Sequence, residues 1–572
     1  MTNSSQRYAK QDNEDKRART RAGQNNLVPQ EPYKCQIAWR VGQVKSTARA
    51  RTSCRIWKSC VYWRKLTQSD CVGGGAGGMT LFQHWLVVGS VLLLMSVIAS
   101  RASGKLGVPA LLLFLMIGVM AGPQGPGHIQ FDDPQTAQSI GIVALMFGVF
   151  AGGLETDWNT VRPVLRDGLA LSTLGVFLTT ALVGYFASLI LHVPLLEGLL
   201  LGAIVSSTDA PTVFEMLRPE RMGLRGRLKP LLELESGSND PMTLFLTTGL
   251  IYLLTHPGTP VTNLVPQLAA QVTIGAALGL LMGKVTLELV NHLQLEHEGL
   301  YPVLTVSLVM FTFGATASLG GNGILAIYLA GLVIGNSDFI HKRSLVRFHH
   351  GLAWLMQIAM FLTLGLLVVP SRIAAIWPAG CLVALFLILI ARPAAVFLTL
   401  QLSGLNRREK AMVAWVGLRG ATPIILATFP LLAGLPRANL IFDLVFFVVT
   451  TSVLLKGISL PMVSRLLGVD APPTSKRQYP LEFVRSHGMK TDLMEVPIPH
   501  DSTAIGKQIV ELGLPKGALV VLIGRGKEFM IPSGGTVLER EDSMLVLADK
   551  ESLRETKKRL QAKPHETHPV QP

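Results

Sequence analysis

Residues 232–242 read LELESGSNDPM and lie between the apolar runs LLLGAIVSSTDAPTVFEML and TLFLTTGLIYLL. Ionisable side chains are unfavourable inside a membrane, where they occur mainly next to a water-filled cavity or a partner of opposite charge. A proline also removes one backbone hydrogen bond from a helix. Two glutamates, an aspartate and a proline within a segment expected to be buried in lipid therefore indicate a functional site.

Apolar runs recur along most of the chain and predict a polytopic α-helical membrane protein. Only 16% of the 572 residues are charged, and the mean hydropathy is +0.41. Runs of about 20 apolar residues are long enough to cross a bilayer as helices. Division at Pro, Gly and charge clusters predicts thirteen transmembrane helices, at 81–100, 106–122, 138–154, 168–192, 195–217, 230–254, 263–292, 300–317, 322–336, 351–369, 374–402, 410–433 and 438–466.

The distribution of basic residues predicts the orientation, because cytoplasmic loops are rich in Lys and Arg. Loops after odd-numbered spans contain fifteen Lys and Arg residues, whereas loops after even-numbered spans contain only Arg372 and Arg437. We therefore expect the N-terminus outside and the residues after the last span in the cytoplasm.

Residues 1–78 do not fit this topology. They contain fifteen Lys and Arg against five Asp and Glu, and four of the five cysteines, without zinc-site spacing. We expect that translation begins at or near Met79 and that the preceding stretch is a misassigned start. The alternative is a basic disordered extension of the kind that binds nucleic acid or anionic lipid. We predict no metal site and no nucleic-acid partner.

The rest of the chain divides into a membrane domain at 79–467, a polar linker at 468–490, a soluble module at 491–560 and a disordered tail at 561–572. The soluble module contains β-type runs such as ALVVLIGR and SMLVLAD, separated by turn signals such as PSGG. This pattern predicts a small α/β domain.

Two aspartates lie near the middle of predicted spans, and each is followed closely by a proline. Asp209 precedes Pro211 in the fifth span, and Asp240 precedes Pro241 in the sixth. Because proline has no amide hydrogen, each leaves a backbone carbonyl without its helical donor, Ser207 in the case of Pro211. Free carbonyls in a membrane must line water or an ion. The pattern predicts two broken helices that bind a monovalent cation at mid-membrane.

The spacing of the polar residues assigns them to two helix faces. Ser236 and Asp240 are four residues apart and share one face, on which the ion would bind. Glu235 and Asn239 share a second face. A buried carboxylate at Glu235 requires a basic partner.

Two arginines deep in later spans could pair with Glu235, namely Arg392 in LILIARPAAV and Arg419 in GLRGATPII. The second motif has a small-residue turn and a mid-span proline, as VSSTDAPTV in the fifth span does. If the seventh span links two repeats of six, spans five and twelve correspond to each other. Paired broken helices that cross at the midplane are typical of the substrate sites of secondary transporters.

These residues carry a resemblance to a known family. The ordered set Thr208, Asp209, Glu235, Ser236, Asn239, Asp240, Pro241, Arg392 and Gly417–Ala421 resembles the signature of the NhaP branch of the monovalent cation:proton antiporters. The soluble module resembles the TrkA-C (RCK-C) regulatory domain. Together they resemble bacterial potassium/proton antiporters, over about Met79 to Leu560. The resemblance implies inverted repeats, broken helices crossing at mid-membrane, a location in the bacterial inner membrane and a homodimer.

The resemblance also implies residue roles. Asp240 would hold a proton or the cation in turn, and Asp209, the Thr208 backbone and Ser236 would complete the coordination. Glu235 and Arg392 would form a structural ion pair. Asn239 is similar to the residue found in electroneutral members, which exchange one cation for one proton. Arg419 in the twelfth span either contacts the ion site electrostatically or braces that span, and both alternatives remain open. Pro211 and Pro241 support the site.

The implied function is exchange of cytoplasmic K+ for external H+ in cation and pH homeostasis, by competition at Asp240, with Na+/H+ exchange as the alternative. No cofactor is expected, and the TrkA-C module would bind a small-molecule regulator. An intramembrane aspartyl protease is disfavoured because neither STDAP nor GSNDP resembles its GxGD context. An RCK-regulated potassium channel is disfavoured because the chain has no TVGYG-like filter sequence.

Overall fold

The computed structural model describes residues 81–106, 108–217, 222–293, 295–337, 339, 341–471, 491–499, 502–526 and 528–560. All of the described residues belong to the unit that begins at Leu81. The expectations for residues 1–78, for most of the linker and for the tail lie outside the described residues.

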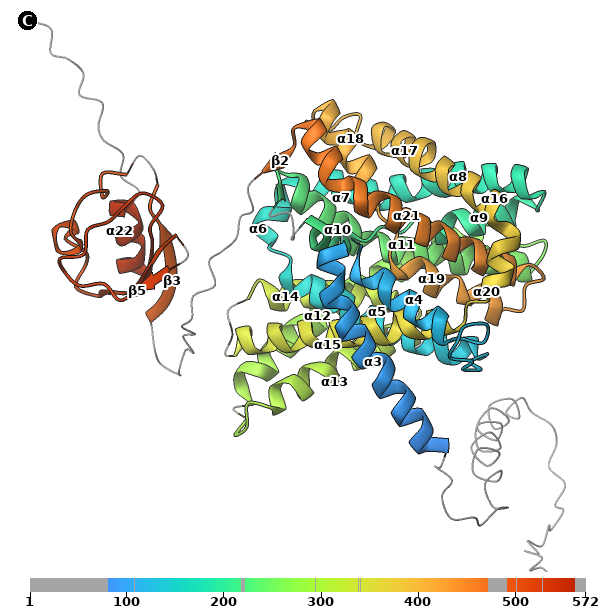
Figure 1. Ribbon diagram of the computed structural model, residues 1–572, viewed down its shortest axis with the longest axis horizontal. Helices are drawn as coiled ribbons and strands as arrows, with labels where there is room; N and C mark the ends of the chain where they lie inside the picture. The colour runs from blue at the N-terminus through green and yellow to red at the C-terminus, as the bar shows by residue number, and fades with distance from the viewer. Residues whose placement is uncertain are drawn as a thin grey trace, which may run out of the picture. The chain divides into compact units, whose positions relative to one another are not determined.

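The apolar part of the chain is mainly helical (Figure 1). Its helices are α3 (Leu81–Leu106), α4 (Ala110–Ala121), α5 (Pro134–Glu155), α6 (Trp158–Val161), α7 (Leu165–Ala170), α8 (Val176–Leu191), α9 (Leu195–Ile204), α10 (Ala210–Leu217), α11 (Leu228–Thr255), α12 (Leu264–His292), α13 (Leu300–Ser318), α14 (Gly323–Gly335), α15 (Lys342–Leu366), α16 (Pro370–Phe386), α17 (Arg392–Thr399), α18 (Arg407–Val416), α19 (Ala421–Leu426), α20 (Thr428–Leu432) and α21 (Ala438–Leu467). Short π-helical turns at Leu171–Gly175 and Leu387–Ala391 join α7 to α8 and α16 to α17.

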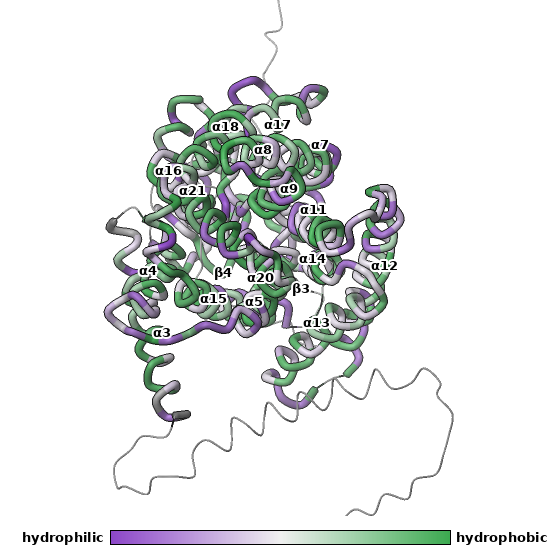
Figure 2. The backbone as a smooth tube through the Cα atoms, turned by 90° about the vertical axis from the view of Figure 1, so that its right-hand side faces the viewer, coloured by the Kyte–Doolittle hydropathy of each residue, from purple (hydrophilic) through white to green (hydrophobic). Residues whose placement is uncertain are grey.

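Among the described residues, seven helices are long and apolar enough to cross a membrane, or eight if α18 and the bent continuation α19–α20 form one span. Figure 2 shows these helices as largely hydrophobic and the connecting loops as more hydrophilic. Each of the thirteen predicted spans coincides with helical segments, several of them short or broken. A polytopic helical membrane protein is therefore confirmed, while the count of thirteen crossings stays a prediction.

The helices pack in two groups. In the first group α12 packs on α14, α14 and α15 pack on α5, and α15 also packs on α4; in the second, α8 packs on α9, α16 on α21, and α11 on α9. Figure 1 shows α12, α13 and α15 on one side of the bundle and α8, α16 and α17 on the other. Glycines allow the closest approaches: a Cβ on Gly279 of α12 would lie 2.5 Å from the carbonyl oxygen of Ala326 in α14. The two groups meet along α11, which contacts α5 and α14, and along α19 and α20, which contact α5.

Two helices are broken at the positions predicted for spans five and twelve. Residues 205–209 separate α9 from α10, and residues 417–420 separate α18 from α19, where the chain bends by 47°. The two breaks touch, because the Asp209 amide donates to the Leu418 carbonyl at 2.9 Å. The predicted crossing of broken helices is therefore present, although the repeat symmetry itself stays a prediction.

The prediction of a broken sixth span is wrong. Helix α11 is continuous from Leu228 to Thr255, with Pro241 in its interior. A single proline removes one helical donor, here the donor to the Gly237 carbonyl, and one lost hydrogen bond does not interrupt this helix of 28 residues. The Asn322 side-chain amide donates to the Pro241 carbonyl at 3.1 Å and so ties the start of α14 to α11 at the proline. The Asp240 carboxylate is thus presented by an intact helix.

The soluble module forms a four-stranded antiparallel sheet in the order β3 (Thr491–Pro497), β6 (Ser543–Asp549), β4 (Ala518–Arg525), β5 (Glu528–Met530). The helix α22 (Lys550–Leu560) follows the central strand β6 and packs on the sheet. Buried apolar side chains such as Val496, Ile523 and Val546 form its core. The predicted α/β module is confirmed.

Candidate functional site

Asp240 lies on α11 where this helix faces the two breaks. Its carboxylate accepts hydrogen bonds from the Ser207 hydroxyl at 2.6 Å and from the Thr422 hydroxyl at 3.3 Å. Ser207 belongs to the first break and Thr422 to the first turn of α19, so both broken helices contribute a donor. The side chain is 7% exposed. Within the described residues it has no Lys, Arg or His partner at salt-bridge distance.

A cavity of about 260 Å³ reaches Asp240. Its lining residues on α11 are Asp240, Leu244 and Thr248, all towards the Thr255 end of that helix. Further lining residues come from α5, α12, α13, the start of α14, and α19–α20. Most of the walls are apolar, with polar atoms supplied by side chains such as Gln271 and Asn322. The carboxylate is therefore buried by protein and still adjacent to space that can hold water or an ion.

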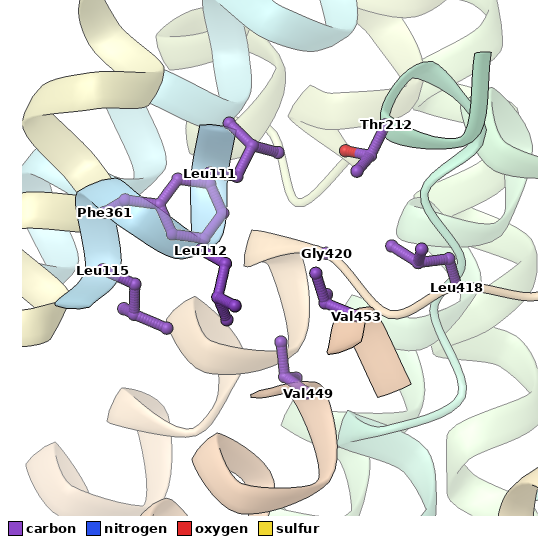
Figure 3. Close-up of a pocket in the computed structure, with 9 residues that line it drawn as sticks. All are labelled: Leu111, Leu112, Leu115, Thr212, Phe361, Leu418, Gly420, Val449 and Val453. Carbon is purple, nitrogen blue, oxygen red and sulfur yellow. The ribbon is translucent and has the colours of Figure 1, made fainter. Parts of the chain in front are cut away.

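A second, much smaller cavity of about 10 Å³ lies against the break at 417–420. Figure 3 shows Leu111, Leu112, Leu115 and Phe361 on one side of it and Val449, Val453 and Leu418 on the other, with Thr212 at its edge. Apolar walls and a volume of about one water molecule are unsuited to an ion.

The polar face beside Asp240 is a hydrogen-bonded cluster around Thr208. The Ser236 hydroxyl donates to the Thr208 carbonyl at 3.0 Å and accepts from the Ala210 amide at 3.1 Å. The Asn239 side-chain amide donates to the Thr208 hydroxyl at 2.6 Å. The structure thus brings the predicted residues Thr208, Ser236 and Asn239 together. They hold the unwound segment 205–209 against α11.

Asp209 caps the start of α10. Its carboxylate oxygens accept from the Thr212 amide at 3.2 Å and the Thr212 hydroxyl at 2.8 Å, the arrangement of a helix N-cap at the start of α10. Gly420 lies directly beneath this carboxylate, where a Cβ would overlap it. Asp209 remains within electrostatic range of Asp240.

Glu235 and Arg392 form a buried ion pair. The Arg392 Nη2 and Glu235 Oε1 atoms are 2.6 Å apart, and each side chain is 2% exposed. Of the two arginines that the sequence offered as partners, the structure selects Arg392. The Thr208 hydroxyl lies 3.5 Å from the same Glu235 oxygen, so the pair borders the polar cluster.

Arg419 supports the break at 205–209. Its Nη1 donates to the carbonyls of Ser206 at 2.6 Å and Ser207 at 2.8 Å, and the residue is fully buried. The Ser207 carbonyl is the one that Pro211 leaves without a helical donor. The guanidinium therefore satisfies a carbonyl that was expected to face an ion or water.

Lys456 on α21 is a site residue that sequence reasoning missed. It is 1% exposed, and its Nζ donates to the Gly417 carbonyl at 2.5 Å, at the C-terminal end of α18. The C-terminal end of a helix carries partial negative charge, which a cation stabilises. The stretch SVLLKGISL contains this lysine within an apolar run, a pattern from which a buried functional lysine could have been predicted. Ser207 and Thr422 were also missed as partners of Asp240.

The comparisons with known proteins agree with this architecture. The family model described as sodium/hydrogen exchanger, transmembrane, matches residues 90–466, and the TrkA-C domain model matches residues 493–561. The K+/H+ antiporter NhaP2 of Shewanella sp. (strain ANA-3) is 40% identical over 477 residues, which cover 82% of each chain. The K+/H+ antiporter NhaP of Alkalimonas amylolytica is 38% identical over 464 residues, covering 81% of this chain and 80% of the relative.

The fold is also found among solved structures. The sodium proton antiporter MjNhaP1 from Methanocaldococcus jannaschii at pH 8 superimposes with a TM-score of 0.59, covering 68% of this chain and all of that chain at 24% identity. This chain belongs to the sodium/hydrogen exchanger family. It is a multi-pass membrane transporter of the cation:proton antiporter class with a TrkA-C domain, and it is not an enzyme.

Proposed function

We propose that this protein exchanges cytoplasmic K+ for external H+, and that the two ions compete for Asp240. A carboxylate in a buried site is stable when a proton or a cation neutralises its charge. Exchange follows if the two helix groups rearrange only when Asp240 is neutral. When Asp240 is charged and no ion is bound, the helix groups do not rearrange, and this prevents either ion from crossing without exchange for the other.

The surroundings of Asp240 carry this proposal. Two hydroxyl donors, Ser207 and Thr422, hold the carboxylate in place without neutralising it. Among the described residues, buried Arg392 is already paired with Glu235. The buried side chains of Arg419 and Lys456 are bound to backbone carbonyls. Asp240 is thus left for an ion that arrives through the adjoining cavity.

The local ligands suit a hard monovalent cation. Oxygen atoms of carboxylates, hydroxyls and backbone carbonyls are the ligands that such ions prefer. Asp240 would supply the charge, and the Thr208 carbonyl, the Ser236 hydroxyl, the Asn239 side chain and Asp209 would complete the shell after a small rearrangement. Asn239 is neutral, so the pair of positions 239 and 240 carries one titratable group, which supports an exchange of one cation for one proton.

Potassium is the proposed cation because relatives at 38–40% identity are named K+/H+ antiporters. Sodium is the alternative, since the Na+/H+ antiporter 1 of Methanocaldococcus jannaschii is 28% identical over 358 residues. The TrkA-C domain would couple transport to a small-molecule regulator. As in the sequence-based expectation, we propose a homodimer in the bacterial inner membrane.

The proposed orientation places the Leu228 end of α11 in the cytoplasm and the Thr255 end outside. The two basic residues predicted outside, Arg372 and Arg437, are both paired with acids: Arg372 Nε lies 3.0 Å from Asp443, and Arg437 Nη1 lies 3.0 Å from Glu197. The orientation is supported by the count of basic residues, fifteen in the loops after odd-numbered spans against these two. In this orientation Leu244 and Thr248, which line the 260 Å³ cavity, lie on the external side of Asp240.

The test is exchange in reconstituted vesicles. Replacement of Asp240 by Asn should abolish K+-driven proton movement, whereas Asp132→Asn, at an exposed loop position, should leave it intact. Exchange that persists in Asp240→Asn would remove the central residue from the proposal. A series of alkali cations in the same assay decides between potassium and sodium.

A further inference from the structure

The surroundings of Asp240 differ between the two directions along α11. Towards the Thr255 end of α11 lies the 260 Å³ cavity. Towards the Leu228 end, about one helical turn away, the aromatic ring of Tyr328 lies against Gly237. A Cβ on Gly237 would be 2.5 Å from Tyr328 Cε2 and 2.8 Å from Cζ, so the ring rests directly on the α11 backbone. No side chain at position 237 separates the two helices.

The position of Tyr328 is set by close packing of α14 on α5. A Cβ on Gly153 would lie 2.5 Å from the Tyr328 carbonyl oxygen, and one on Gly331 would lie 2.7 Å from the Phe150 carbonyl oxygen. Tyr328 is 4% exposed. Its hydroxyl lies near Thr156 but forms no hydrogen bond of normal geometry within the described residues. The ring is therefore held by packing, and its buried hydroxyl gains little from this position.

Beyond the Tyr328 ring, polar groups reappear. Glu233 precedes Gly237 by four residues on α11 and forms a 3.6 Å ion pair with Lys229. It also interacts electrostatically with Glu155 at the end of α5 and with Tyr328. Carboxylates on this side would attract cations from the cytoplasm. Along α11, Gly237 and the Tyr328 ring packed on it come between Glu233 and Asp240.

We propose that Tyr328 is the barrier residue that closes the Asp240 site to the cytoplasm in this conformation. The ring belongs to one helix group and Gly237 to the other, so the barrier opens when the groups move apart and needs no separate hinge. Gly237 is required because any side chain there would push the ring away. This proposal rests on the proposed exchange at Asp240 and adds a residue that controls access to it.

The test is the proton tightness of vesicles in the absence of K+ and Na+. A pH gradient is imposed, and its decay is followed with a fluorescent dye. Tyr328→Leu removes the ring and should accelerate the decay about tenfold, a change of about 1.4 kcal/mol in the closed state. Tyr328→Phe keeps the ring and should be as tight as the parent protein. Tyr185→Leu, at a position 60% exposed on α8, is the matched control and should also be tight.

Further variants connect the leak to the site. Gly237→Ala should leak protons as Tyr328→Leu does, because the new methyl group displaces the ring. If Tyr328→Leu does not fold, Gly237→Ala tests the barrier proposal in its place. Adding Asp240→Asn to a leaking variant should abolish the leak. The barrier proposal would be overturned if Tyr328→Leu or Gly237→Ala folds normally and its vesicles are as tight to protons as those of the parent protein. If the barrier proposal fails in this way, loss of exchange in Asp240→Asn would still support the proposed function. Failure of the barrier proposal is therefore distinguishable from failure of the proposed function.

Discussion

The ion pair between Glu235 and Arg392 makes a quantitative prediction about stability. Two unit charges 2.6 Å apart attract each other by about 6 kcal/mol at an effective dielectric constant of about 20. Removal of one partner from a buried pair costs about 3–5 kcal/mol, because the other charge stays buried without compensation. Arg392→Met should cost this amount, since Arg392 is the direct ionic partner of Glu235 and the Thr208 hydroxyl, 3.5 Å from the same oxygen, is neutral.

The assay is thermal unfolding of the purified protein in detergent. At about 2 °C per kcal/mol, Arg392→Met should lower the melting temperature by about 6–10 °C. The double variant Glu235→Gln/Arg392→Met leaves no uncompensated charge and should recover more than half of that loss. Arg437→Met breaks an ion pair whose arginine is 46% exposed and should cost about 0–1 kcal/mol.

Two results would refute this reasoning. One is an Arg392→Met variant with the stability of the parent protein, which would mean that Glu235 is not charged and paired in the folded state. The other is a double variant that is no more stable than Arg392→Met alone.

Two further variants probe other charges. Lys456→Met deprives a backbone carbonyl at the end of α18 of a charged donor, so we expect a loss of about 1.5–3 kcal/mol in stability and slower exchange, with Lys456→Arg closer to the parent in both assays. Asp133→Ala removes the N-cap of α5 and should cost about 1 kcal/mol at neutral pH without changing exchange. The hydrogen bond from the Thr136 hydroxyl lowers the pKa of Asp133 below 3.8, so the cap contributes fully above that value and is lost as the pH falls through the lowered pKa. The difference in melting temperature between Asp133→Ala and the parent should therefore shrink at strongly acidic pH.

The sequence was most informative where one local rule decides the structure. Apolar runs of bilayer length predicted the helices, and Pro211 after Asp209 predicted the break between α9 and α10. The same rule failed at Pro241, because the loss of the one donor to the Gly237 carbonyl is a small perturbation within a continuous helix of 28 residues. Whether a proline breaks a helix depends on tertiary contacts that a single segment does not contain.

The partners of the site residues were less predictable for the same reason. The choice between Arg392 and Arg419 for Glu235 depends on how distant helices pack, and only the geometry resolves it. Ser207 donates to Asp240 because the breaks cross beside α11. Lys456 differs from these residues because its position within an apolar run is a local feature of the sequence and indicates burial without knowledge of the packing.

The most direct measurement of the competition at Asp240 is the rate of exchange as a function of K+ concentration at several pH values. If proton and cation share one carboxylate, the apparent KM for K+ should rise as the pH falls, approaching about tenfold per pH unit where the protonated form dominates, while the maximal rate stays constant. An apparent KM that is independent of pH, with a maximal rate that falls in acid, would show that the two ions bind at separate sites and would contradict the account.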